Sequence, residues 1–164
     1  MKSSPSNFMN KSAVKIRPAR QEDIGRLVSL LEELFAIEED FTFEASRQHQ
    51  GLLLMLESTI SCILVAEENH SVIGMCTGQL TISTAEGSVA LLVEDVVVAR
   101  DWRGRGVGRQ LLDRIARWAA DQGASRMQLL ADRHNSAALD YYTRSGWQQI
   151  QLICLRKRQK TKGL

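Results

Sequence analysis

The chain has 164 residues, 44% of them hydrophobic and 24% charged, and its formal net charge at pH 7 is +2. These values are typical of a globular protein long enough to bury a core, and they exclude the strongly basic field that attracts nucleic acid. No apolar run approaches the roughly 20 residues of a membrane-spanning helix, so the sequence predicts no membrane partner either.

The ends of the chain and its cysteines indicate a compartment and a domain. Residues 1–12 are polar and lack the apolar segment of a secretory signal, and residues 156–164 form a basic tail. The cysteines are odd in number and lie far apart in apolar runs: Cys62, Cys76 and Cys154. Reduced, buried thiols in a cytoplasmic protein fit this pattern better than disulfides or a metal site. One domain is therefore expected over residues 13–155, between two tails.

In chain order, the first expected elements are a strand, two helices and a hairpin. Residues 14–17 favour a short strand, and apolar residues at helical spacing predict a helix over 21–35. A second helix is predicted over 52–56, after a polar segment. Residues 62–66 and 72–82 have the composition of strands and flank a polar Glu-Asn-His-Ser turn, which indicates a β-hairpin.

The second half alternates strands and helices. The sequence predicts a strand over 90–99 and then a helix from Val107 that ends before Gly123, where a capping glycine belongs. This strand–helix–strand unit should be a right-handed crossover between parallel strands. The remaining expected elements are a strand over 125–130, a helix over 135–145 closed by Gly146 and Trp147, and a last strand over 148–155. The sequence thus predicts an α/β fold, a single domain with a mixed central β-sheet flanked by helices.

A glycine-rich loop joins the strand over 90–99 to the next helix. Its sequence over 102–109, Trp-Arg-Gly-Arg-Gly-Val-Gly-Arg, has a glycine at every second position. A dinucleotide loop needs its third glycine where Arg109 stands, and no Walker sequence occurs. Glycines still let the backbone approach an anion closely, and free N–H groups at a helix start point toward it. An anion cradle is one interpretation, and a flexible connector with solvated arginines is the other.

Two runs of the sequence contain family motifs. The run from Val98 to Leu112 and the run from Asn135 to Trp147 resemble motif A and a later block of the GNAT superfamily of acetyl-CoA-dependent N-acetyltransferases. Motif A is Gln/Arg-x-x-Gly-x-Gly/Ala, and in the later block an Asn precedes Ala-Leu-x-x-Tyr and a closing Gly-Phe/Trp. The positions that match motif A are Arg103, Gly106 and Gly108. The resemblance spans residues 14–155 and implies a GNAT-like acyl-CoA N-acyltransferase fold, with acetyl-CoA as cosubstrate and no metal.

The resemblance also implies where acetyl-CoA would bind. The backbone of Val96, Val97 and Val98 would pair with the pantetheine arm as an added strand, and an N–H near Val98 would polarise the thioester carbonyl. Asn135 would contact the arm from the next element, although this residue type also suits a helix N-cap. The N–H groups expected to hold the pyrophosphate are those of Arg103, Gly104, Arg105, Gly106, Val107, Gly108 and Arg109.

Tyr142 matches the family tyrosine that protonates the departing thiolate. It shares a predicted helical face with Asn135, Ala138 and Leu139, so it should face the protein. The resemblance implies that it also contacts the coenzyme. The alternative is a core tyrosine whose hydroxyl bonds to any nearby acceptor. The catalytic demand is modest, because a thiol with a pKa of about 8.5 leaves readily as thiolate.

A general base is expected, because an alkyl amine with a pKa of about 10 must lose a proton before it attacks. Glu94 and Asp95 are the first candidates, since two carboxylates interrupt a central apolar strand where unpaired buried charge is costly. Strict alternation would place Glu94 on the face of Val96 and Asp95 on the other face, and a bulge would change this parity. The alternative is a pair of structural acids, each satisfied by an arginine or by N–H groups. Asp132, at the end of the next strand, is a third candidate.

The acceptor side is expected at residues 35–44, where acidic side chains accompany Phe35, Phe41 and Phe43. Such a wall suits a cationic amine with an apolar body, and a solvated acidic face over buried aromatics is the alternative. The prediction is an enzyme that acetylates a primary amine, of a small molecule or a protein, by direct attack through a tetrahedral intermediate. The competing hypothesis is an acyl-CoA-binding or interaction module without turnover. A homodimer is compatible with either function.

Overall fold

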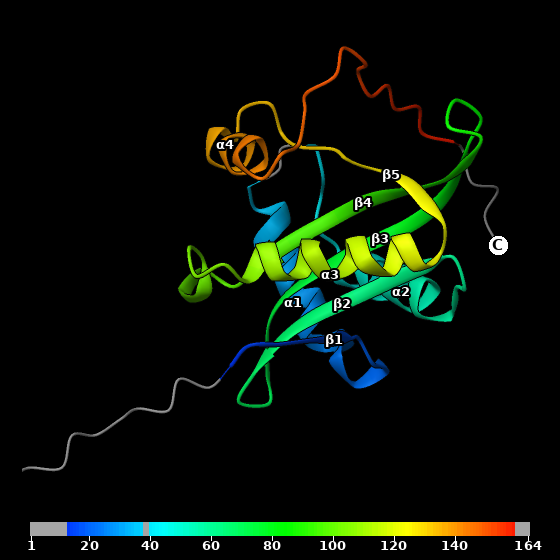
Figure 1. Cartoon of the computed structure of the whole chain (residues 1–164). Helices are drawn as coiled ribbons and strands as arrows, with labels where there is room; N and C mark the ends of the chain where they lie inside the picture. The colour runs from blue at the N-terminus through cyan, green and yellow to red at the C-terminus, as the bar shows by residue number, and fades with distance from the viewer. Residues whose placement is uncertain (1–12, 38–39, 160–164) are drawn as a thin grey trace, which may run out of the picture. The chain divides into compact units, whose positions relative to one another are not determined.

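The computed structural model describes residues 13–37 and 40–159 of the chain. These residues belong to two compact units, Met1–Leu129 and Leu130–Leu164, which we describe separately (Figure 1). None of the described helices is long and apolar enough to cross a membrane.

The first unit contains a five-stranded mixed sheet with the order β1-β2-β3-β4-β5. Neighbouring strands from β1 to β4 are antiparallel, and β4 and β5 are parallel. The strands are β1 Lys15–Pro18, β2 Ser61–Glu68, β3 Ser71–Ser83, β4 Ser88–Val98 and β5 Ala124–Leu129. The predicted mixed sheet and the parallel crossover at its end are therefore confirmed.

Helices cover both faces of this sheet: α3 lies on one face, and α1 and α2 lie on the other (Figure 1). The helices of the first unit are α1 Ile24–Phe35, α2 Ala45–Glu57 and α3 Val107–Asp121, with short 3-10 turns η1 Gln21–Asp23 and η2 Arg100–Trp102. The second helix begins well before the expected residue 52. The prediction missed its first turns because they are polar and exposed and so lack an apolar stripe. Gly123 follows α3 with a φ of +81°, as the predicted cap requires.

Two apolar clusters hold the helices on the sheet. On one face, Leu27 and Leu30 of α1 are fully buried together with Met75 and Val97 of the sheet. On the other face, Gly78 of β3 lets α3 approach the sheet closely. A Cβ atom at Gly78 would lie 2.7 Å from Cδ1 of Ile115, so a larger residue would push the helix away. This packing fixes the position of β4 and of the loop that precedes α3.

The hairpin between β2 and β3 has the expected polar turn. Asn69 and His70 both have positive φ angles, of +49° and +62°. A two-residue turn of this kind matches the right-handed twist of the strands that it joins. The predicted hairpin is therefore confirmed, with Glu68 paired to Ser71 across the turn.

A buried charge cluster ties β1 to β2 and to η1. Arg17 donates to both carboxylate oxygens of Asp23, at 2.7 and 2.9 Å, and its Nε donates to Glu67 at 2.7 Å. These hydrogen bonds hold the pKa of the Asp23 carboxyl below its ordinary value. Each charge in the cluster has an opposite partner, so the cluster is structural.

The second unit contains α4, Ser136–Arg144, with defined caps at both ends. Oδ1 of Asn135 accepts the N–H of Ala138 at 3.1 Å, which is an N-cap bond. Gly146 has a φ of +88°, its N–H donates to the Thr143 carbonyl, and the N–H of Trp147 donates to the Tyr142 carbonyl. These two bonds are the Schellman closure that the sequence predicted.

The predicted last strand over 148–155 is wrong. The structure describes all of residues 148–159, and none of them is in a strand. Apolar alternation indicated a strand, but a strand also needs a neighbour to pair with, which composition cannot supply. The apolar side chains here are exposed: Ile150, Leu152, Ile153 and Leu155.

Candidate functional site

β4 continues beyond the end of its parallel neighbour. Pairing between β4 and β5 runs from Val89↔Ala124 to Val93↔Leu129 and then stops. Residues 96–98 of β4 remain paired to β3, with Val98 opposite Gly74, and residues 94–98 have no partner on β5. The backbone polar groups on this edge are therefore available to an extended chain, which can add to the sheet as a strand would.

A β-bulge interrupts β4 where the two carboxylates lie. Cys76 of β3 pairs with Val96 and Gly78 pairs with Val93, so Thr77 alone stands opposite Glu94 and Asp95. A bulge of this kind places one extra residue in a strand and changes which face the following side chains occupy. The expected alternation of Glu94 and Asp95 therefore does not hold.

Both carboxylates lie on the same face of the sheet. Asp95 bonds to Thr77 and Glu94 bonds to Gln79, and these two β3 residues are two positions apart, so they share a face. It is the face of Met75, which packs in the cluster beneath α1 and α2. The expectation that Glu94 and Asp95 point to opposite faces is thus wrong, and the bulge is the reason.

The two carboxylates differ in their surroundings. Oδ2 of Asp95 accepts the Thr77 hydroxyl at 2.7 Å, and the N–H of Asp95 donates to the same Oγ1 at 3.0 Å. Burial raises the pKa of Asp95 to about 6, because desolvation outweighs the Thr77 hydrogen bond that favours the charged form. Glu94 is exposed and accepts Nε2 of Gln79 at 2.9 Å. The site thus pairs one accessible carboxylate with one half-buried carboxylate whose pKa is raised.

The loop after β4 presents unbonded backbone donors. Within the described ranges, no hydrogen-bond acceptor exists for the backbone N–H groups from Gly104 to Arg109. Gly104 and Gly106 have φ angles of +73° and +79°, which L side chains rarely adopt, and Gly106 is the N-cap of α3. A run of free N–H groups that ends at a helix N-terminus is a site for an anion.

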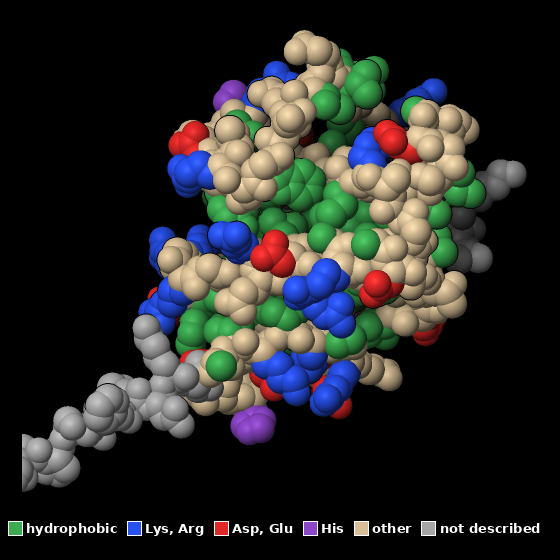
Figure 2. Space-filling model, in the orientation of Figure 1, with side chains coloured by type: hydrophobic (Ala, Val, Ile, Leu, Met, Phe, Trp, Pro, Cys, Tyr) green, Lys and Arg blue, Asp and Glu red, His purple; other side chains and the backbone are tan. Residues whose placement is uncertain are grey.

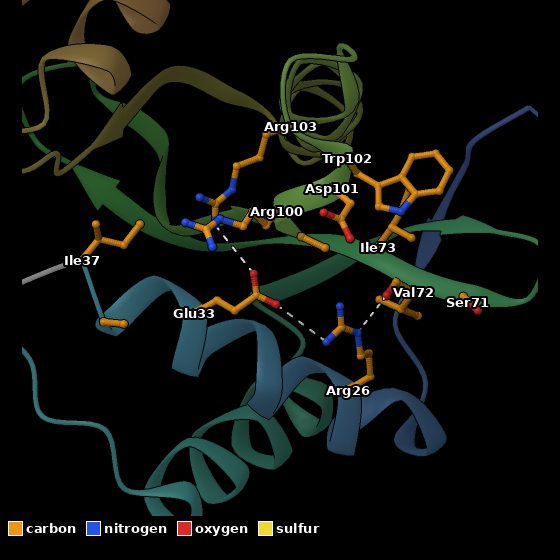
Figure 3. Close-up of a pocket in the computed structure, with 12 residues that line it drawn as sticks. Arg26, Glu33, Ile37, Ser71, Val72, Ile73, Arg100, Asp101, Trp102 and Arg103 are labelled. Carbon is orange, nitrogen blue, oxygen red and sulfur yellow. Dashed lines mark hydrogen bonds and ion pairs between the residues drawn. The ribbon is translucent and has the colours of Figure 1, made fainter.

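Arginine side chains surround these donors, and Figure 2 shows Lys and Arg gathered around the loop that precedes α3. Arg105 and Arg109 are exposed, and the Arg105 guanidinium lies 4.9 Å from the ring centre of Trp102. Arg103 instead turns back toward α1, where Glu33 lies (Figure 3). The loop therefore combines backbone N–H groups with exposed positive charge, which suits an anion better than a neutral ligand. No group of three or more metal-ligating side chains occurs among the residues described.

The expected acceptor side lies partly outside the described residues, because Glu38 and Glu39 are not described. Phe35 at the end of α1 stacks on Phe41 with ring centres 5.1 Å apart. Glu44, just before α2, pairs with Arg47 at 2.7 Å. The described part of the segment therefore contains an aromatic pair, and its Glu44 carboxylate is paired with an arginine.

The remaining predicted site residues lie in the second unit. Asn135 caps α4, and Oδ1 of Asp132 accepts the N–H of His134 at 2.8 Å in the turn before the helix. The Tyr142 ring contacts Trp147 edge to face, with ring centres 5.9 Å apart. These are local contacts, and the roles of the three predicted residues toward a ligand stay predictions.

Three polar residues near the site were missed by sequence reasoning. Thr77 and Gln79 hold the two carboxylates, and Glu33 of α1 approaches Arg103. Polar residues inside the apolar strand 72–82 were an available signal for the first two. Glu33 had no such signal, because acidic residues are ordinary on an amphipathic helix.

Comparisons with known proteins agree over most of the chain. A model of the acetyltransferase (GNAT) family matches residues 28–147. Thialysine N-epsilon-acetyltransferase of Bos taurus is 28% identical over 147 residues, which cover 84% of this chain and 85% of that protein. The uncharacterized N-acetyltransferase YhfO of Bacillus subtilis (strain 168) is 29% identical over 140 residues, covering 83% of this chain and 91% of that protein. The solved structure of aminoglycoside N-acetyltransferase AAC(6')-Iy in complex with CoA is similar with a TM-score of 0.80 at 19% identity, over 92% of this chain and 99% of that one.

Proposed function

Because the chain belongs to the acetyltransferase (GNAT) family, we propose that it transfers the acetyl group of acetyl-CoA to a primary amine. One observation carries the proposal: the end of β4, which has no partner on β5, leads into the run of unbonded N–H groups from Gly104 to Arg109. An amide-containing arm matches a free strand edge, and a pyrophosphate matches a helix N-terminus. Coenzyme A has both parts in this order.

In this proposal the coenzyme is held mainly through the backbone. Val96, Val97 and Val98 pair with the pantetheine arm, and an N–H near Val98 polarises the thioester carbonyl. Donors fixed in this way stabilise the negative charge that develops on the oxygen during attack. The match of Asn135 to the family block makes it a further candidate contact for the arm. The arginines of the loop add an attractive field, which is screened as salt increases.

Glu94 is the proposed general base. Its carboxylate is exposed, so it can reach the amine directly or through one water, whereas the half-buried Asp95 accepts the Thr77 hydroxyl. The neutral amine then attacks the thioester, and the tetrahedral intermediate collapses with loss of the coenzyme thiolate. Tyr142 is the proposed acid for that thiolate. Asp132 becomes the candidate base if Glu94 and Asp95 both prove dispensable.

The proposed acceptor is a cationic amine with an apolar body. The Phe35–Phe41 stack offers an apolar wall, and the same segment carries the acidic residues Asp40 and Glu44, of which Glu44 is paired with Arg47. Aromatic faces and carboxylates together attract ammonium groups. The related enzymes whose names give an acceptor, thialysine for one and aminoglycosides for another, act on amines that are charged at neutral pH.

The test is thiol release from acetyl-CoA in the presence of a panel of diamines, amino acids with amine side chains, aminoglycosides and lysine peptides. We expect amine-dependent release with at least one class, and mass spectrometry should find the acceptor heavier by one acetyl group. Calorimetry with coenzyme A runs in parallel. Binding without turnover on any amine would favour the acyl-CoA-binding module, and absence of binding would contradict both functions.

Tyr142→Phe tests the assignment of the acid. The substitution keeps the ring that packs on Trp147 and removes the hydroxyl, so we expect kcat to fall by about 100-fold while the affinity for coenzyme A changes little. Tyr141→Phe on the same helix is the matched control and should keep its activity. Full turnover in Tyr142→Phe would mean that Tyr142 is a packing residue.

A further inference from the structure

Arg103 makes two contacts that turn its side chain away from the open side of the loop. Its Nε donates to the Val98 carbonyl at 2.9 Å, and its Nη2 lies 3.7 Å from Oε2 of Glu33 on α1 (Figure 3). One planar guanidinium thus joins the end of β4, the loop and a helix of the opposite layer. A lysine has a single ammonium group and cannot reproduce both contacts.

Glu33 is in turn held from its other side. Nη1 of Arg26 lies 3.9 Å from its Oε1, and Nε of Arg26 donates to the Val72 carbonyl at 3.0 Å (Figure 3). These residues line a groove of about 730 Å³ between α1, the start of β3 and η2. These contacts therefore link Val72, at the start of β3, through Arg26 and Glu33 to Arg103 in the glycine-rich loop before α3.

The peptide between Val98 and Ala99 is held at both ends by this arrangement. The Ala99 N–H donates to the Ile73 carbonyl at 2.8 Å, and the Val98 carbonyl accepts Arg103. Beyond Arg103, the N–H groups of the loop have no partner within the described ranges. Arg103 is thus the last side chain that anchors the loop before its free donors begin.

We propose that Glu33 and Arg103 form a latch that positions the pyrophosphate loop, so that the affinity for coenzyme A depends on a glutamate that does not touch the coenzyme. This inference rests on the proposed function. Holding the free N–H groups in one arrangement before binding lowers the conformational cost of binding. Both residues act through the loop backbone and are positioning residues.

Simple charge attraction makes the opposite prediction. If Arg103 served only to attract phosphate, Arg103→Lys would keep the affinity, because the charge is preserved. Glu33→Gln would then strengthen binding, since it removes a negative charge close to the anion site. The latch predicts that both substitutions weaken binding.

The experiment is calorimetry with coenzyme A on the full chain and on Glu33→Gln, Arg103→Lys and the double variant. We expect the Kd of each single variant to rise about two- to fivefold, the range for an exposed ion pair. The double variant should bind no more weakly than the weaker single variant, because either change opens the same latch. Glu22→Gln is the matched control, since Glu22 pairs with Arg20 on the exposed surface.

Kinetics gives a second measurement that a general loss of stability would not reproduce. At saturating acetyl-CoA, kcat should stay near the wild-type value while KM for acetyl-CoA rises. Glu33→Gln that binds coenzyme A as tightly as the wild type, or more tightly, would overturn the latch, and so would an Arg103→Lys variant with wild-type affinity. A wild-type chain that does not bind coenzyme A would instead overturn the proposed function, and the latch with it.

Discussion

Two clusters of carboxylates lie against the same sheet and behave in opposite ways. At β1 and β2, Asp23 and Glu67 share the guanidinium of Arg17, and the pKa of Asp23 is lowered. At the bulge of β4, the side chains that hydrogen-bond to Glu94 and Asp95 in the described part of the chain are the neutral Gln79 and Thr77, and the pKa of Asp95 rises to about 6.

The charge of the partner distinguishes a structural carboxylate from one that can act in catalysis. A carboxylate paired with arginine is a poor base, because its proton affinity is low and its oxygens are occupied. A carboxylate beside neutral donors can still accept a proton from a substrate. Its charge has no opposite partner, which lowers the stability of the fold. We therefore expect substitutions in the first cluster to change stability and those in the second to change catalysis.

The largest effect should come from Glu94→Gln, which keeps the shape and removes the proposed base. At pH 7 we expect kcat/KM to fall by about 100-fold or more, the usual contribution of general base catalysis. The loss should shrink as the pH approaches the pKa of the amine, where the neutral acceptor no longer needs a base. Initial rates over a pH series with one acceptor measure both features.

Glu68→Gln is the control for this change, because Glu68 lies at the end of β2 and its carboxylate accepts Nδ2 of the neighbouring Asn69 at 3.3 Å. It should retain wild-type rates. If Glu94→Gln keeps the wild-type pH profile, Glu94 is not the base, and the comparison between the clusters fails on its catalytic side.

Asp95→Asn should change how stability depends on pH. The pKa of Asp95 is higher in the folded protein, so its favourable contribution is complete below pH 4 and is lost as the pH rises through about 6. Relative to Asp95→Asn, the wild type should therefore lose about 3 kcal/mol of unfolding free energy in total between a pH well below 4 and a pH well above 6. Urea unfolding at a series of pH values measures this difference, and a constant difference would mean that Asp95 is not desolvated.

Asp23→Asn should affect the fold and spare the chemistry. We expect the unfolding free energy at pH 7 to fall by about 2 kcal/mol, less than the 3–5 kcal/mol of a fully buried pair, because Glu67 still compensates Arg17. The loss should disappear at low pH, since a group with a lowered pKa contributes only while it is ionised. Thermal unfolding measures the expected loss of stability, and kcat on the same samples measures whether activity is kept. A fall in kcat without loss of stability would contradict a purely structural role for Asp23.

Local patterns predicted the order of helices and strands up to α4, because apolar periodicity, caps and turns depend on residues that are neighbours in the sequence. Gly123, Gly146 and the hairpin turn are examples, and each lies where its sequence context indicated. The segment over 148–155 had the same kind of signal, yet strand formation also depends on a partner that sequence alone does not reveal.

The site was predictable in composition but not in geometry. The paired carboxylates and the glycine loop drew attention as residue types, whereas the bulge depends on the register between β3 and β4. The contacts of Glu33 with Arg103 and of Arg17 with Glu67 join residues far apart in the chain. Such long-range pairs cannot be inferred from one sequence by period or spacing.

The smallest effect concerns Thr77, whose hydroxyl stabilises the charged form of Asp95. Thr77→Val removes this hydrogen bond and should raise the pKa of Asp95 further, by about half a unit to one unit, the equivalent of one hydrogen bond. Thr77→Ser keeps the hydroxyl and is the control, and carboxyl NMR titration measures the pKa in both variants. The acid limb of kcat/KM then decides how the pair works. If the acid limb of kcat/KM moves with the pKa of Asp95, Asp95 shares the base function with Glu94. If the pKa of Asp95 moves and the limb does not, Glu94 acts alone, and an unchanged pKa in Thr77→Val would show that the neutral partner does not set the proton affinity of this cluster.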